Sequence, residues 1–133
     1  MKLMLDTNTC IFVIKRRPPA VLERFLEYQG GEIGISSITL AELRYGVAKS
    51  RIVEKNSRAL DEFIVPLEVA AFGEEAARAY GDIRHALETA RTPIGSMDML
   101  IAAHALSLGT ILITNNTREF SRVPRLEVVD WSA

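Results

Sequence analysis

The sequence predicts an α/β protein with a central, mostly parallel sheet that is covered by helices on both faces. Two observations lead to this fold class. Short apolar runs alternate along the chain with segments whose apolar residues recur at the helical period, which is the pattern of βαβ units. In addition, residues 97–108 are apolar almost all round, as expected for a helix that is buried between other elements.

The length and composition favour one globular domain in the cytoplasm. With 133 residues, 48% of them hydrophobic, the chain has enough apolar material for one core, and no repeat or linker divides it, so we expect a single domain over residues 1–133. The single cysteine, Cys10, excludes an internal disulfide, and no cluster of Cys and His indicates a zinc site. No apolar run approaches the roughly 20 residues that span a bilayer, and Asp6 interrupts the first run, so we expect neither a membrane segment nor a signal peptide.

The charge balance does not favour a nucleic-acid interface that covers the whole molecule. Sixteen Lys and Arg against seventeen Asp and Glu give a formal net charge of -1. Binding of a polyanion would therefore require a local basic patch.

In the first half of the chain, caps and prolines separate the expected elements. Residues 2–5 form an apolar run that ends in the Asp-Thr-Asn sequence of residues 6–8, and these residue types favour turns and helix caps. Pro19 is a favoured first-turn residue, and Ser36 and Ser37 are good caps for the helix that follows them. The expected elements are strands at 2–5 and 33–35, and helices at 10–14, from 19 to the glycines at 30–31, at 38–47 and at 51–64.

In the second half, the helix over residues 97–108 is the clearest expectation. Ser96 is expected to be its N-cap, Asp98 falls in the first turn where a carboxylate suits the helix dipole, and Gly109 is a good C-terminal stop. The other expected features are a short apolar piece at 67–70, a helix at 73–87, a strand at 110–114, a polar loop at 115–124 with room for one helical turn, and a strand at 126–129.

Four acidic residues map to one edge of the predicted sheet. In a doubly wound sheet, the loops that leave the carboxyl ends of the strands form the ligand crevice, and each crossover helix begins at that same edge. Asp6 leaves the first strand, and Glu42 lies one turn into the helix after the second strand. Asp98 opens the helix before the next strand, and Glu119 follows that strand. Each acid alone also has an ordinary explanation, because Asp6 and Asp98 suit helix starts and Glu42 and Glu119 suit a solvated surface. The observation that indicates a site is the edge that the four acids share.

Converging carboxylates predict a divalent cation. They repel one another and have raised pKa values unless a cation screens them. Mg²⁺ or Mn²⁺ prefers oxygen ligands, keeps several waters and takes only one or two carboxylates directly, so we expect Asp6 and Asp98 as metal ligands with Glu42 and Glu119 beside them. Such an ion orients a phosphodiester, offsets developing charge and activates a water molecule. The residues expected to support the carboxylates or the waters are Thr7, Asn8, Thr114 and Asn116.

Four motifs of this chain together resemble those of the PIN-domain ribonucleases of the VapC toxin type. Each motif is weak alone, but all four occur in the family's order and spacing, and they extend from one end of the chain to the other. They are Leu-Asp-Thr-Asn at 5–8, Ser-Ile-Thr-Leu-Ala-Glu-Leu-Arg-Tyr-Gly at 37–46, Gly-Ser-Met-Asp-Met-Leu-Ile-Ala-Ala-His at 95–104 and Thr-Asn-Asn-Thr-Arg-Glu-Phe at 114–120.

The resemblance implies an α/β/α sandwich and an endoribonuclease that depends on Mg²⁺ or Mn²⁺. It also implies a homodimer, and a small VapB-type antitoxin whose tail enters the active-site groove in a higher assembly. Within the family, the chain is similar to the enterobacterial-type members that cut initiator tRNA in the anticodon region. The family's acidic set falls on Asp6, Glu42 and Asp98 of this sequence.

The fourth acidic position departs from the family pattern. Many family members have Asp where this chain has Asn116, and Glu119, one helical turn later, is the candidate to take over that role. Arg44 and Arg118 flank the acids and are the best candidates for contacts with RNA phosphates, although a solvated helix face is the ordinary role of such residues. His85 and His104 have no partner at metal-ligand spacing, and we expect both to be packing or surface residues.

Two other functions fit parts of the pattern. A PIN-fold module could bind an antitoxin or RNA without cleaving, but a groove for RNA alone has no use for acids where phosphates must approach. A phospho-acceptor signalling domain also gathers acids and Mg²⁺ at the end of a parallel sheet. That class requires a Lys near the acids on a late strand, and residues 110–114 and the loop after them contain none.

Overall fold

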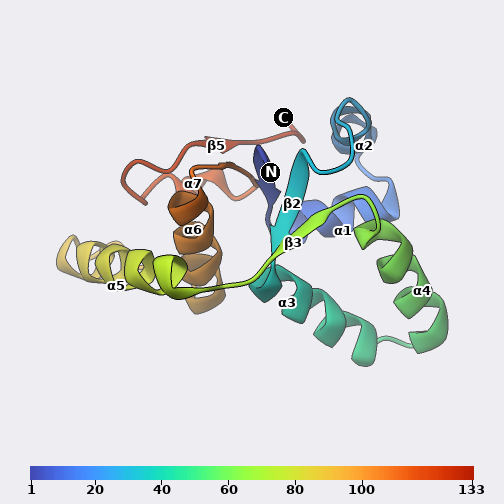
Figure 1. Cartoon of the computed structure of the whole chain (residues 1–133), viewed down its shortest axis with the longest axis horizontal. Helices are drawn as coiled ribbons and strands as arrows, with labels where there is room; N and C mark the ends of the chain where they lie inside the picture. The colour runs from blue at the N-terminus through green and yellow to red at the C-terminus, as the bar shows by residue number, and fades with distance from the viewer.

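The computed structural model describes residues 1–133 and contains one five-stranded sheet in the order β3-β2-β1-β4-β5 (Figure 1). All four neighbouring pairs are parallel. The central strand β1 pairs with β2 through Leu3 and Ile33, and with β4 through Leu5 and Ile113. The strands are β1 (Leu3–Leu5), β2 (Ile33–Ser36), β3 (Glu68–Ala70), β4 (Ile111–Ile113) and β5 (Val128–Val129).

Helices cover both faces of the sheet, which makes the molecule an α/β/α sandwich. In Figure 1, α5 and α6 lie on one side of the strands, and α1, α3 and α4 lie on the other. The helices are α1 (Thr7–Lys15), α2 (Pro19–Leu26), α3 (Ser37–Ala48), α4 (Val53–Ile64), α5 (Glu74–Thr89), α6 (Ser96–Leu108) and α7 (Thr117–Phe120). No helix has both the length and the hydrophobicity needed to cross a membrane.

The alternation of side chains along the strands produces two cores, one on each face. Met4 and Leu112 point to the face where α5, α6 and α7 pack. Leu3, Leu5 and Ile113 point to the other face, where they meet buried residues of α1 to α4. Every residue of β1 is therefore buried, as is typical of a central strand in a doubly covered parallel sheet.

The helix α6 is buried along most of its length, as the sequence predicts. Met99 and the run from Ile101 to Ala105 are all buried. The helix ends at Gly109, which has the left-handed φ of 66° that favours glycine. The expected N-cap is wrong by one residue, because Gly95 is the cap and Ser96 is the first helical residue. Asp98 nevertheless lies in the first turn, as expected.

The remaining elements follow the predicted order with small shifts at their ends. The expected strands at residues 2–5, 33–35, 110–114 and 126–129 correspond to β1, β2, β4 and β5. The apolar piece at 67–70 contains β3, an edge strand that pairs with β2 through Val69 and Ile35. The polar loop after β4 does contain a helical turn, α7.

Candidate active site

The sheet brings the four predicted acids to its carboxyl edge. Asp6 follows the central strand β1, and Glu42 projects from α3, which begins where β2 ends. Asp98 lies in the first turn of α6, and Glu119 lies in α7, just after β4. Because β1 pairs with both β2 and β4, the segments that carry these acids are neighbours at one edge, although they are far apart in sequence.

Asp6 is the most deeply buried of the four acids, with 4% of its surface exposed. It is the N-cap of α1, and its Oδ1 accepts a hydrogen bond of 2.9 Å from the backbone N–H of Thr9. Its Oδ2 accepts one of 2.5 Å from the hydroxyl of Thr114, which in turn accepts one from the N–H of Asn116. Burial raises the pKa of Asp6, and these hydrogen bonds act in the opposite direction.

Glu42 is held by the residue next to Asp6. The hydroxyl of Thr7 donates a hydrogen bond of 2.5 Å to Oε1 of Glu42, so the first residue of α1 fixes a carboxylate of α3. Glu42 also raises the pKa of Asp6 through charge repulsion. The two carboxylates are therefore close enough to interact.

Asp98 has the strongest electrostatic signature of the site. Its pKa is raised to about 6, mainly by burial and then by repulsion from Glu119, Asp6 and Glu42 in that order. Asp98 thus interacts electrostatically with all three other predicted acids. A surface carboxylate on an isolated helix would not have these neighbours. Gly95, the cap of α6, lies next to this side chain, and a Cβ built there would make ordinary van der Waals contact with Oδ2 of Asp98 at 3.4 Å.

The fourth position is occupied by a pair of residues. Nδ2 of Asn116 donates a hydrogen bond of 2.9 Å to Oε2 of Glu119. The carboxylate that repels Asp98 is thus that of Glu119, while Asn116 orients it. The backbone N–H of Asn116 is itself bonded to Thr114, so the pair is connected to Asp6 through one threonine.

The donor set fits a hard divalent cation, although it is not a closed cage. No group of three or more acidic, His or Cys side chains converges closely enough to form a complete set of metal ligands. Mg²⁺ and Mn²⁺ need only one or two carboxylates directly, because waters complete their coordination. Asp6 suits this role, since each of its carboxylate oxygens keeps a lone pair beyond its hydrogen bond within the chain, and Asp98 is the partly buried acid that the other three repel. A cation between them would also relieve the repulsion that raises the pKa of Asp98.

The other predicted residues are distributed unevenly around the acids. Of the four supporting residues, Thr7, Thr114 and Asn116 contact the acidic cluster, whereas Asn8 is exposed on the first turn of α1. Arg118 is exposed beside Glu119. The other RNA-binding candidate, Arg44, is exposed and pairs with Asp61 of α4 at 2.8 Å.

One residue of the site, Thr9, was not among the residues that the sequence predicts. Thr9 supplies the N–H that caps onto Asp6, and its hydroxyl donates to the carbonyl of Ile113 across 3.1 Å. The spacing of an N-cap Asp and the N3 position was the available signal. His104, expected to be a packing or surface residue, is 2% exposed, and its Nδ1 lies 2.7 Å from Oγ of Ser36. His85 is exposed on α5.

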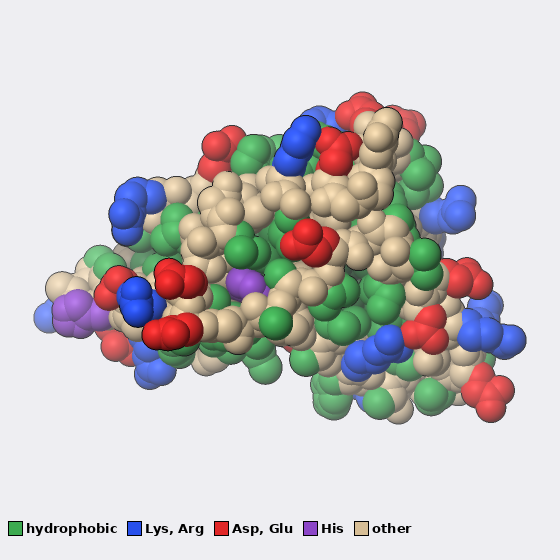
Figure 2. All heavy atoms as spheres, viewed as in Figure 1, with side chains coloured by type: hydrophobic (Ala, Val, Ile, Leu, Met, Phe, Trp, Pro, Cys, Tyr) green, Lys and Arg blue, Asp and Glu red, His purple; other side chains and the backbone are tan.

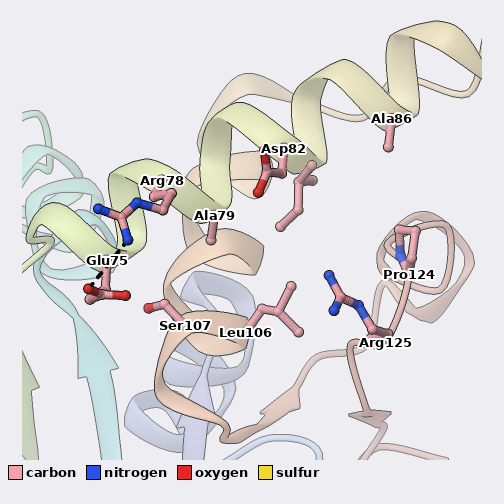
Figure 3. Close-up of a pocket in the computed structure, with 10 residues that line it drawn as sticks. Glu75, Arg78, Ala79, Asp82, Ala86, Leu106, Ser107, Pro124 and Arg125 are labelled. Carbon is pink, nitrogen blue, oxygen red and sulfur yellow. Dashed lines mark ion pairs between the residues drawn. The ribbon is translucent and has the colours of Figure 1, made fainter.

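Two of the surface hollows lie between helices, and one of these two includes a predicted acid, Glu42, in its lining. A groove of about 340 Å³ between α1, α3 and α4 is lined mainly by apolar residues, and Glu42 lies at its wall. A second hollow, of about 350 Å³, opens between α5, the end of α6 and the loop before β5 (Figure 3). None of the four predicted acids lines it, and its charged residues are of both signs: Glu75, Arg78, Asp82 and Arg125. Figure 2 likewise shows acidic and basic side chains interspersed over the visible face rather than one broad basic patch.

This fold, with its acids at the carboxyl edge of a parallel sheet, defines a class of proteins. The model of the PIN domain family matches residues 3–126, and the chain belongs to that family.

Relatives across the full length narrow the comparison further. The chain is 47% identical to the tRNA(fMet)-specific endonuclease VapC of Shigella flexneri, over 99% of each chain. It is 44% identical to the ribonuclease VapC2 of Haemophilus influenzae strain KW20, over 98% of each chain. Among solved structures, the DNA-bound VapBC of Salmonella typhimurium superposes with a TM-score of 0.93 at 46% identity, again over 98% of each chain. VapBC-1 of nontypeable Haemophilus influenzae gives a TM-score of 0.89 at 36% identity over the full length of both chains.

Proposed function

We propose that this protein is the toxin of a type II toxin-antitoxin system and acts as an Mg²⁺-dependent endoribonuclease, with Mn²⁺ as an alternative ion. The single observation that carries the proposal is the meeting of four acids at the carboxyl edge of the sheet, where burial and the three other acids raise the pKa of Asp98 to about 6. A cluster of mutually repelling carboxylates is costly unless it binds a cation. The names of the full-length relatives, endonuclease and ribonuclease VapC, support the same reaction class.

Each acid has a proposed task. Asp6 and Asp98 hold the cation, and Glu42 and Glu119 complete the acidic set as catalytic residues. When bound, the ion would orient the scissile phosphodiester, offset the charge that develops on it and make a water molecule more acidic. The chain keeps the carboxylates in place with hydroxyl and amide donors, which are Thr114 for Asp6, Thr7 for Glu42 and Asn116 for Glu119. Arg44 and Arg118 are the proposed contacts to RNA phosphates.

The proposed substrate is tRNA, and specifically initiator tRNA cut in its anticodon region. The support is the name of the Shigella flexneri relative, which is 47% identical over 99% of this chain. Because tRNA is a cytoplasmic molecule, we place the activity in the cytoplasm.

The proposed partner is a VapB-type antitoxin. Three solved relatives are VapBC complexes, and two of these are DNA-bound. The groove beside Glu42 offers the partner an apolar surface that leads to the acids. An antitoxin segment that lay in this groove would inhibit cleavage by covering the site. We further propose that residues 1–133 are one PIN domain, that the toxin is a homodimer, and that the antitoxin joins two such chains in a higher assembly.

The competing function is a module that keeps this fold and binds an antitoxin or RNA without cleaving. To decide between the two, the chain freed of any co-purified partner is incubated with a total tRNA pool in Mg²⁺ and in EDTA. Asp98→Asn, purified identically, controls for contaminating nuclease. Discrete fragments only from the wild type with Mg²⁺ support the nuclease. Intact tRNA with a folded wild type in Mg²⁺ would favour the binding module.

A further inference from the structure

His104 is a buried polar residue that does not belong to the acidic cluster. Its Nδ1 lies 2.7 Å from Oγ of Ser36, a contact between residues 68 positions apart, and both side chains are buried. We propose that His104 is a positioning residue that sets the spacing between the helices carrying Glu42 and Asp98. The proposal rests on the proposed nuclease function, because it concerns the geometry of that same site.

One hydrogen bond joins the imidazole to the start of α3. Oγ of Ser36 already accepts a hydrogen bond of 3.0 Å from the N–H of Ile38, so its own hydroxyl proton is free to be donated to Nδ1 of His104. A neutral ring that accepts this proton carries its own on Nε2. Burial lowers the pKa of His104, which favours the neutral ring, and the backbone of Ala71 acts in the opposite direction.

Three segments of the chain meet at this imidazole. Ser36 ends β2 and is the N-cap of α3, Ala71 directly follows β3, and His104 belongs to α6. Phe72 packs against the ring edge-on, with centroids 5.4 Å apart and an interplanar angle of 74°. The N–H of Phe72 also donates to Oγ of Ser37 across 3.1 Å. The start of α3 is thus tied to α6 by a polar link and to the segment after β3 by another.

The contact between Ser36 and His104 is separated from each of the two acids by the same number of residues. Glu42 lies six positions after Ser36 on α3, and Asp98 lies six positions before His104 on α6, which is about 9 Å along each helix axis. The helices α3 and α6 also contact each other directly. A hydrogen bond between them therefore limits sliding and rotation of one helix against the other, and so fixes where Asp98 lies relative to Glu42. Misplacement of a reacting group by about 1 Å can cost roughly 100-fold in rate.

Packing alone does not account for a histidine at this position. An apolar residue of similar size would fill the space without the cost of burying two polar ring atoms. Such an apolar residue would, however, leave the buried hydroxyl of Ser36 without an acceptor. Nδ1 of His104 is used in the contact with Ser36, which fits a residue that fixes an orientation.

The test compares substitutions that remove different parts of the link. His104→Phe keeps an aromatic ring against Phe72 but loses the hydrogen bond to Ser36, and His104→Asn keeps an acceptor near the place of Nδ1. Ser37→Ala is the matched control, because it removes a hydrogen bond at the same helix start without touching His104. The readouts are the Kd for Mn²⁺ of the RNA-free chain, from electron paramagnetic resonance of free Mn²⁺, and kcat and KM for tRNA cleavage. All are measured at a temperature where every variant is folded.

We expect His104→Phe to weaken Mn²⁺ binding and to lower kcat by about tenfold each, with KM for tRNA changed by less than about twofold. His104→Asn should recover to within about threefold of the wild type, and Ser37→Ala should match it. If His104→Phe does not fold, His104→Leu removes the same hydrogen bond, leaves the cap of α3 in place and should show the same two losses. Losses no larger than those of Ser37→Ala would overturn the role of His104 alone. A folded wild type that neither binds Mn²⁺ nor cleaves tRNA would overturn the proposed function and this role with it.

Discussion

The hydroxyl of Thr114 donates a hydrogen bond of 2.5 Å to Oδ2 of Asp6 and joins the ends of two neighbouring strands, β4 and β1. The same hydroxyl accepts the N–H of Asn116, so one side chain serves a buried carboxylate and the start of the α7 segment. Loss of this hydroxyl should therefore affect both the carboxylate and the N–H.

Thr114→Val should destabilise the metal-free chain because it leaves Oδ2 of Asp6 and the N–H of Asn116 without their partner. The cost of such unsatisfied groups is about 1–3 kcal/mol in the free energy of unfolding, measured by urea titration at pH 7.5. The pKa of Asp6 should rise further, because the hydrogen bond that opposes the effect of burial is gone. Thr114→Ser keeps the hydroxyl and is the control. Equal stability of the Val and Ser variants would show that this bond contributes nothing.

Asp98→Asn should abolish cleavage and also change how the stability of the metal-free chain depends on pH. The pKa of Asp98 is raised in the folded chain from 3.8 to about 6, so the folded state binds this proton more tightly than the unfolded state does. That contribution to stability is fully present below about pH 4 and is lost as pH rises through about 6. The wild type should therefore lose stability between about pH 4 and pH 7 in EDTA.

The Asn variant should lack this part of the pH dependence and should melt at a higher temperature than the wild type at pH 7.5 without metal. Asp82→Asn, which neutralises an exposed acid on α5, is the control for net charge. Thermal melting curves at several pH values provide the measurement. Parallel pH profiles for the wild type and Asp98→Asn would argue against the repulsive cluster.

Glu119→Gln and Asn116→Ala should distinguish the contributions that the two residues of the fourth acidic position make to cleavage. If Glu119 supplies the functional carboxylate, its replacement by Gln should lower kcat at least about tenfold. Asn116→Ala removes only the 2.9 Å hydrogen bond that orients this carboxylate, so the loss should be smaller. Both rates are compared in the same cleavage assay with Mg²⁺. A larger loss for Asn116→Ala would assign the leading role to the amide.

Gly34→Ala should destabilise the sheet, whereas Gly81→Ala should not. A Cβ at Gly34 would lie 2.6 Å from the backbone carbonyl oxygen of Glu68, so β2 and β3 would have to separate. We expect a loss of about 1–3 kcal/mol in the free energy of unfolding. A Cβ at Gly81, inside α5, meets nothing within 4 Å, and alanine there should add about 0.5–1 kcal/mol. Chemical denaturation of both variants gives the comparison, and a stable Gly34→Ala would contradict the strand spacing.

The sequence predicted the order of elements well because caps and period are local properties. Asp6 is a helix cap in the structure, as its residue type and its place after an apolar run indicate. The cap of α6 was assigned to Ser96, but the structure begins the helix at that residue and uses Gly95. A rule based on residue type favours serine, whereas the cap in the structure makes no side-chain hydrogen bond, so residue type carries no signal for it.

The acids were predictable as a set, but their supports were not. The rule that crossover helices begin at the carboxyl edge places Asp6, Glu42 and Asp98 together without any knowledge of side-chain contacts. The link between Ser36 and His104 spans 68 positions and depends on how α6 packs on the sheet. No local pattern carries that information, so the sequence indicated only that His104 had no metal-ligand partner nearby.

The most direct test of the central claim, that the carboxyl-edge acids form a metal-dependent nuclease centre for initiator tRNA, is cleavage of purified initiator tRNA with the fragment ends mapped. Elongator methionine tRNA is the substrate control, and Asp98→Asn and EDTA are the controls for the site. The account predicts one cut in the anticodon region of initiator tRNA, made only by the wild type with Mg²⁺ or Mn²⁺. Cleavage that persists in Asp98→Asn or in EDTA would contradict it.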